Sequence, residues 1–200
     1  MRIPVLLSAG FLAAVTAGCA SYEHKPVDYQ AVESGGHSVT LDGVTVAADA
    51  LETAAETVGA FDEDLTEEGI VPVQVLVRNG AAGNIIVQRG TVHLIDAAGQ
   101  VHRPVGAVVV AEAVEDNAMA YALLGFGIFS YASAQEANKE RTADYQSKEL
   151  DETRIVVPGA EYGAFVYFKL PKGVDPNSSR LKLQVQHVGS NQVSDIEIEL

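Results

Sequence analysis

Alternation of apolar and polar residues is the feature that most restricts the fold of this chain. It is clearest over residues 71–77, where valines at every second position alternate with Pro72, Gln74 and Leu76. A period of two places successive side chains on opposite faces of a β-strand. The same alternation recurs in other short segments, namely 38–46, 162–170, 181–186 and 195–200. Several short strands with one apolar face each predict a mainly β fold, an antiparallel immunoglobulin-like β-sandwich.

Turn signals separate the predicted strands. The alternation changes phase at Asp42-Gly43, which predicts a bulge or a tight turn. Residues 96–99 have Asp at the first place and Gly at the last place of a type I turn. Pro72 cannot donate a backbone hydrogen bond, so we expect it at the start of its strand or on a sheet edge.

A short N-terminal helix is predicted at about 50–59. Asp49 and Glu52 fit an N-cap and its partner three residues later. Its apolar stripe would consist of Leu51, Ala54, Ala55 and Val58.

A helical insert at about 117–150 interrupts the strand pattern. Its first part, residues 118–134, contains no charged side chain. Three roles are open for this part: a membrane-spanning helix of marginal length, a helix buried against the sandwich, or a surface that dips into a membrane or docks on a partner. Gly125 and Gly127 suit the last role because glycine allows close backbone approach, but they would also suit a turn between two helices.

The second part of the insert is polar and has the composition of a helix. Ser133 and Glu136 fit a capping box that would start this second helix. Asp144 and Lys148 are four residues apart, so we expect them to pair on its surface.

The N-terminal residues have the order of an export signal. Arg2 is the only charged residue before Cys19, and the uncharged stretch 3–18 is too short to cross a bilayer core of about 30 Å as a helix. Small residues precede Cys19, which is the only cysteine in the chain. A plain secretory signal followed by an incidental cysteine is the alternative to a lipid attachment site.

Thr16-Ala17-Gly18-Cys19 resembles a bacterial lipobox, although that family usually has Leu at the place of Thr16. The resemblance implies a diglyceride on the Cys19 thiol, cleavage before Cys19, and acylation of the new amino group, for example by palmitate. Several acyl chains hold a protein on a membrane more firmly than one. Ala20 stands where an Asp usually retains such lipoproteins in the inner membrane, so the resemblance implies the outer membrane and its periplasmic face.

The chain is therefore predicted to have three parts. Residues 1–18 are a lipoprotein signal peptide, 19–37 a lipidated flexible tether, and 38–200 the β-sandwich domain with its helical insert. The tether is polar and contains Pro26. A flexible chain of this length would reach about 20–25 Å on average, which would hold the domain clear of the lipid head groups.

Charge restricts the partners. The formal net charge is −14, and removal of the signal peptide takes away one more positive charge. Phosphate backbones demand a basic face, so this charge argues against nucleic acid and against electrostatic docking on anionic lipids. With Cys19 acylated, no thiol remains for a disulfide or a cysteine-based metal site. The acyl chains on Cys19 are then the predicted membrane attachment.

A search for catalytic and metal-binding patterns identifies no site. The chain has no Gly-x-Ser-x-Gly, no His-Glu-x-x-His and no glycine-rich phosphate loop. The histidines are scattered, and the predicted turn at 96–99 would place His102 opposite Leu94, with His93 on the other face of the sheet. The acidic loop 62–68 lacks the spacing of a Ca²⁺ loop and is interpreted as a solvated charge run. We therefore expect no enzymatic activity, no cofactor and no metal.

Residues 38–200 resemble bacterial lipoproteins of uncharacterised function with a single sandwich domain. The likeness lies in strand edges and turns, in 69–75 leading to Arg78-Asn79 and in 157–159 leading to 165–168. It implies fold and compartment only. The preferred function is a non-catalytic envelope module that binds a protein partner or supports an assembly. The alternative is a binder of an apolar or lipidic ligand beneath residues 118–134.

Overall fold

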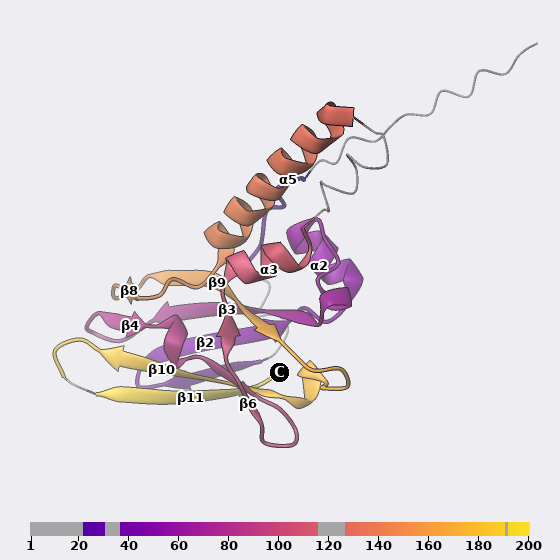
Figure 1. Cartoon of the computed structure of the whole chain (residues 1–200). Helices are drawn as coiled ribbons and strands as arrows, with labels where there is room; N and C mark the ends of the chain where they lie inside the picture. Colours follow the sequence, from indigo (N-terminus) through magenta and orange to yellow (C-terminus); the bar gives the residue numbers. More distant parts are fainter. Residues whose placement is uncertain (1–21, 31–36, 116–126, 191) are drawn as a thin grey trace, which may run out of the picture.

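Two antiparallel β-sheets and a layer of helices form the structure, a computed structural model that describes residues 22–30, 37–115, 127–190 and 192–200 (Figure 1). The fold is mainly β, as the alternation predicts. The helices lie on one side of the stacked sheets, so the layers follow the order helices, first sheet, second sheet (Figure 1).

The first sheet is built around β3 (Ile70–Asn79). It pairs with β2 (Val44–Ala50) on one side and with β9 (Glu161–Lys169) on the other. β1 (Ser38–Leu41) extends the sheet beyond β2, and β7 (Pro104–Val105) extends it beyond β9. All of these pairings are antiparallel.

The second sheet is centred on β10 (Arg180–His187), which pairs along most of its length with β11 (Val193–Glu199). On its other side, β5 (His93–Ile95) pairs with the first residues of β10, and β4 (Ile85–Val87) pairs with the last. The outer strands are β6 (Val101–His102) beside β5 and β8 (Arg154–Val156) beside β4.

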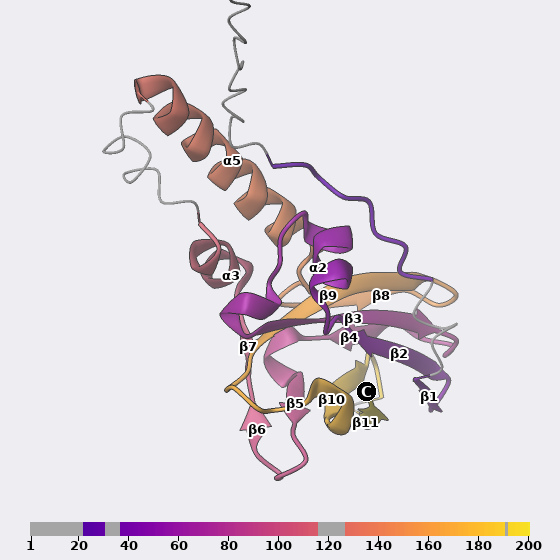
Figure 2. The same ribbon diagram turned by 90° about the vertical axis from the view of Figure 1, so that its right-hand side faces the viewer.

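The helix layer consists of α2 (Ala54–Phe61), α3 (Ala107–Ala113) and α5 (Gly127–Lys148) (Figure 2). α5 starts well away from the sheets and runs toward them, so that its C-terminal half packs on the domain (Figures 1 and 2). Short 3-10 helices are η1 (Thr66–Glu68), η2 (Arg89–Thr91) and η3 (Pro176–Ser178).

The main hydrophobic core lies between the two sheets. Side chains from β2, β3 and β9 meet those from β4, β5, β10 and β11 there. Most of the apolar residues that alternation assigns to the inner faces are buried in this core, among them Val73, Val166, Leu183 and Ile196, whereas Leu41 of β1 is 39% exposed. The period of two therefore predicted correctly which faces of these strands point inward.

β3 and β9 differ from the prediction because both of their faces are buried. Gln74 and Leu76 on the outer face of β3 are only 7% and 2% exposed. On the outer face of β9, Phe165 and Tyr167 are completely buried. The reason is the layer above the first sheet, which covers polar and apolar side chains alike.

The predicted turn at Asp42-Gly43 is confirmed. Both residues have positive φ, 51° and 81°, and Leu41 pairs with Val44, which makes a two-residue hairpin loop. Pro72, by contrast, lies inside β3 rather than at its start or on an edge. The carbonyl of Pro72 accepts a hydrogen bond from Leu51 N at 2.9 Å, just beyond the end of β2. The position of the missing N–H is therefore at the end of the pairing between β2 and β3.

The short predicted helix is present as α2, but its cap and its buried face differ from the prediction. Thr53, not Asp49, is the N-cap, and it forms a capping box with Glu56. Asp49 lies within β2 instead. Phe61 is buried on the inner face of α2, whereas Val58 of the predicted stripe is 42% exposed.

The helical insert is arranged differently from the prediction. α3 precedes it and is not among the predicted elements. α5 runs without interruption through Ser133, so the predicted helix start at Ser133 and Glu136 is wrong. Most of the uncharged stretch 118–134 lies outside the described residues. Within the described part of the chain, each helix is too short or too polar to span a bilayer.

Candidate functional site

The inner face of α5 is charged. Arg141, Asp144 and Lys148 follow one another at spacings of three and four residues and are 3%, 3% and 5% exposed. Burial of a charge is unfavourable unless a partner and hydrogen bonds compensate for the lost water. The partners of these three side chains identify the region as the candidate site.

Asp144 and Lys148 form the predicted pair, but in the interior rather than on the surface. Lys148 Nζ lies 2.6 Å from Asp144 Oδ2 and donates to the carbonyl of Ala60 at 2.7 Å. The same ammonium lies 5.1 Å from the centre of the Phe61 ring. Burial lowers the pKa of Lys148, while Asp144 acts in the opposite direction.

Two residues near the N-terminus complete the surroundings of Asp144. Tyr22 OH donates to Asp144 Oδ2 at 2.5 Å, and His24 Nε2 lies 2.8 Å from Asp144 Oδ1. The Tyr22 ring is buried edge-on against Tyr145, with ring centres 6.1 Å apart. Burial and the bond to Asp144 raise the pKa of Tyr22 far above its ordinary value.

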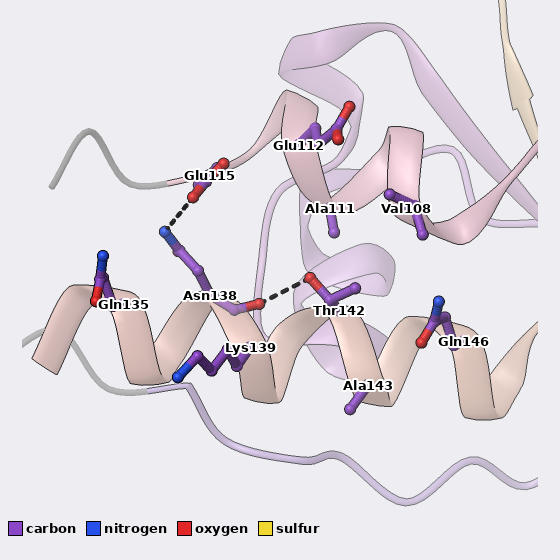
Figure 3. Close-up of a pocket in the computed structure, with 10 residues that line it drawn as sticks. All are labelled: Val108, Ala111, Glu112, Glu115, Gln135, Asn138, Lys139, Thr142, Ala143 and Gln146. Carbon is purple, nitrogen blue, oxygen red and sulfur yellow. Dashed lines mark hydrogen bonds between the residues drawn. The ribbon is translucent and has the colours of Figure 1, made fainter. Parts of the chain in front are cut away.

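Arg141 connects α5 to two other elements. It pairs with Glu63 of the acidic loop and donates to Asn138 Oδ1 at 2.6 Å. Asn138 in turn donates to Glu115, just after α3, at 2.8 Å (Figure 3). The charged face of α5 is therefore tied to the loop after α2 and to the end of α3.

The acidic loop 62–68 is only partly the solvated charge run that the sequence indicates. Asp62 accepts from the backbone N of Glu23 at 2.9 Å and lies 3.2 Å from Lys25 Nζ. Asp64 accepts from Thr66 N at 2.9 Å within the loop. These contacts give the two carboxylates separate partners, and among the described residues no group of three or more His, Asp or Glu side chains could hold a metal ion.

Aromatic rings fill the space below the charges. Phe61 lies 4.8 Å from Phe165 and 5.2 Å from Tyr145, measured between ring centres. Tyr167 OH donates to the carbonyl of Tyr145 at 3.0 Å. Burial raises the pKa of both Tyr145 and Tyr167. The buried charges of α5 thus lie against a layer of aromatic rings, which shields them from water on that side.

Residues 22–30, which we call the N-terminal strap, run from α5 across the outer face of the first sheet (Figure 2). Near the end of the strap, the Tyr29 ring lies directly over Gly163, where a Cβ would come within 2.3 Å of Tyr29 Cγ. Gln74 Nε2 donates to the carbonyl of Asp28 at 2.9 Å. This part of the predicted flexible tether is therefore docked on the domain.

A groove between α3 and α5 opens to solvent beside the buried charges (Figure 3). Its volume is about 490 Å³. Val108 and Ala111 of α3 face Asn138, Thr142 and Gln146 of α5 across it, and Glu112 also lines the groove. The hydrogen bond between Asn138 and Glu115 spans the groove near one end. The groove therefore combines a small apolar floor with polar sides.

The histidine hairpin has a structural role. His102 lies opposite Leu94, as predicted. His102 Nε2 is 2.9 Å from Asp96 Oδ2, and the other oxygen of Asp96 accepts from the backbone N of Gln100 at 2.9 Å. These hydrogen bonds lower the pKa of Asp96. His93 Nδ1 lies 3.2 Å from the carbonyl of Thr91.

Only part of this site is predictable from the sequence. The spacing of Asp144 and Lys148 predicts their pairing, but nothing in the pattern indicates Arg141 or Tyr22 as a partner. The available signal was the placement of three charges on one helix face, which indicates pairing across that face. Cys19, the predicted lipid attachment, lies outside the described residues, three residues before the strap begins.

Comparison with known proteins identifies no family. No family model and no curated protein matches the chain. Among solved structures, the crystal structure of the yjhA protein from Bacillus subtilis is similar, with 13% sequence identity and a TM-score of 0.44. The match covers 81% of this chain and 96% of that chain. A similarity at this level assigns neither a fold family nor a function.

Proposed function

We propose that this chain is a lipid-anchored, non-catalytic binding module of the cell envelope. Acyl chains on Cys19 would attach it to the outer membrane, with the domain on the periplasmic side. The lipobox-like residues 16–19 support the anchor. The net charge of −14 disfavours nucleic acid, so the proposed partner is another envelope protein.

The observation that carries the binding role is an open groove beside a helix that buried ion pairs hold in place. Lys148 ties α5 to the end of α2, and Arg141 ties it to the acidic loop. The side of α5 that faces α3 stays open to solvent, and Val108 on the opposite wall is 43% exposed. A fixed groove with an apolar floor and polar sides suits a segment of a partner protein.

We further propose that the two sheets are an immunoglobulin-like sandwich to which the helix layer and the strap have been added. The support is the single core shared by two antiparallel sheets. Crystallography tests this class: mean strand directions about 30° apart between the two sheets would agree with it, and directions near 90° would contradict it.

The lipid anchor is tested by Cys19→Ser, which removes the thiol that would be acylated. We expect the unmodified protein to fractionate with membranes and its intact mass to include the acyl chains. The variant should leave the membrane fraction or keep its signal peptide, and its mass should lack the acyl chains. A variant that stays membrane-bound with an unaltered mature mass would contradict the anchor.

The groove is tested by photo-crosslinking in cells. A photoreactive residue placed at Val108 should give an adduct with a discrete envelope protein. The matched control is Val193 in β11, which is 50% exposed but lies on the second sheet. The adduct at Val108 should weaken when Glu112 in the same groove is changed to Lys. Identical adducts at Val108 and Val193 would contradict a specific site.

The apolar-ligand alternative stays a prediction, because residues 118–134 lie mostly outside the described residues. It is checked by extracting the purified protein and analysing the extract by mass spectrometry. Lipid recovered from the domain in a fixed ratio, beyond the chains on Cys19, would favour this alternative over a protein partner.

A further inference from the structure

The strap begins close to the proposed lipid. Tyr22 is the third residue after Cys19, and consecutive Cα atoms are 3.8 Å apart, so the two Cα atoms are separated by at most about 11 Å. This limit holds whatever path the chain takes. A free tether of residues 19–37 would reach about twice as far on average.

The strap is held at both ends of its course. At its start, Tyr22 is 8% exposed and donates to the buried carboxylate of Asp144. At its end, Tyr29 packs against Phe165, with ring centres 5.7 Å apart, over the space that Gly163 leaves free. The backbone of the strap is bonded as well, because the N of Glu23 donates to Asp62. Several independent contacts would have to break before the strap could lengthen the tether.

We propose that the docked strap holds one flank of α5 against the lipid head groups of the membrane that carries the anchor. This inference rests on the lipid anchor proposed above. The flank is the surface around Tyr22, a shallow hollow lined by His24, Glu140, Ala143, Asp144 and Ser147. The acyl chains supply the affinity, and the strap sets the orientation. The bilayer surface is therefore the partner of this flank.

The same geometry places the groove near the membrane. Ala143 lines both the hollow around Tyr22 and the groove between α3 and α5, so the two surfaces adjoin across one helix. A helix with its side chains is about 10 Å thick. A partner bound in the groove would therefore lie within about 10 Å of the lipid head groups. This closeness favours a partner that is itself bound to the membrane.

Fluorescence quenching by head-group spin-labelled phosphatidylcholine measures the orientation. The full-length lipidated protein is reconstituted in phosphatidylcholine vesicles, and a thiol-reactive fluorophore is placed at Ser147→Cys in one sample and at Val193→Cys in another. Cys19 is the only native cysteine and is acylated, so each label has one site. We expect strong quenching at 147 and little at 193, which is on the second sheet. Equal quenching at both positions would overturn the inference.

A pair of insertions separates the strap from the tether as a whole. About twelve Gly and Ser residues inserted after Ala20 add roughly 19 Å of mean reach before the strap. The same insertion after Glu33 follows the strap in the sequence and leaves the number of residues between Cys19 and Tyr22 unchanged. We expect the first insertion to abolish most of the quenching at 147 and the second to leave it intact. Equal loss in both variants would show that the strap is not docked.

The two proposals fail in different ways. A protein that carries no acyl chains and does not float with the vesicles would overturn the anchor and, with it, the orientation. A lipidated, vesicle-bound protein whose two insertions act alike would overturn the orientation alone. A far-ultraviolet spectrum and a melting curve of each insertion variant confirm that the domain is folded.

Discussion

Asp144 links α5 to the strap through its carboxylate. Tyr22, His24 and Lys148 all contact its carboxylate, and it is 3% exposed. A buried ion pair adds little stability compared with an apolar pair of the same size, because both charges lose their water. Removal of one partner is a different matter, since it leaves the other charge buried and uncompensated.

Lys148→Met tests this asymmetry. We expect the free energy of unfolding to fall by about 3–5 kcal/mol, because Asp144 loses its cation. The double variant with Asp144→Leu should be more stable than Lys148→Met alone, as it removes the uncompensated charge. Urea unfolding measures both. Lys182→Met is the control, because Lys182 pairs with Glu197 on the surface and should change stability by less than about 1 kcal/mol. Additive losses in the double variant would contradict the pairing.

Asp96→Asn tests the turn between β5 and β6. The pKa of Asp96 is lowered by its bonds to His102 and to backbone N–H groups, so the folded state favours the ionised carboxylate. The stabilisation is therefore complete above the unfolded pKa of about 3.8 and is lost as the pH falls through the lower folded value. We expect a lower melting temperature for the variant at pH 5–7 and a shrinking difference below pH 4. A difference that is constant from pH 7 to pH 3 would contradict the assignment.

At the scale of elements, α2 shows how a local signal selects one helix start among several. Thr53 and Glu56 bond reciprocally, whereas Asp49 is part of β2. Thr53→Ala should lower the free energy of unfolding by about 1 kcal/mol, because it removes the side-chain acceptor of the cap. Thr53→Ser should retain most of the stability. Val58→Ala on the exposed side of α2 is the control. A larger loss from Val58→Ala than from Thr53→Ala would contradict the observed cap.

The strands and turns were predictable because one local rule governs them. Wherever a single core lies on one side of a strand, as in β10 and β11, the period of two reveals the buried face. The rule fails for β3, whose second face is covered by helices and the strap. Gln74 is buried there by a contact with Asp28, far away in the chain, and no local pattern encodes that contact.

The candidate site was predictable only in part, for a related reason. A helix that packs through apolar residues reveals its inner face by periodicity, but α5 packs through Arg141, Asp144 and Lys148. The spacing of Asp144 and Lys148 indicated a pair and could not indicate its burial. The strap escaped prediction because its anchors, Tyr22 and Tyr29, stand singly in a polar segment.

At the scale of the whole molecule, the core between the two sheets and the layer between the first sheet and the helices bury different kinds of side chain. Among the described residues, the hydrophobic core between the sheets is mostly aliphatic, with Phe168 inside it and the partly buried Tyr162 packed against it. The layer between the first sheet and the helices contains ion pairs and buried tyrosines. The stability of the helix layer should therefore depend on pH more strongly than that of the sheets.

Alkaline titration tests this difference. Burial raises the pKa of Tyr29 to about 12 and those of Tyr22, Tyr145 and Tyr167 as well. A pKa raised in the folded state means that stability is complete below the unfolded value of about 10 and is lost as the pH rises toward the folded values. Lys148 acts with the opposite sign, because its lowered pKa makes stability rise with pH up to its unfolded value, but it is one group against several tyrosines.

We therefore expect the urea midpoint of the unmodified protein to fall steadily from pH 9.5 to pH 11.5. The urea midpoint of Tyr167→Phe should fall less steeply over the same range. Most of the increase in tyrosinate absorbance should coincide with the loss of the helix signal in circular dichroism, because Tyr22, Tyr145 and Tyr167 are buried. The tyrosines beneath α5 can ionise only when the layer opens, because an ionised ring cannot stay in an apolar site. A single ionisation step near pH 10 with the helices intact would show that these rings are accessible to water and that the layer is not packed as described.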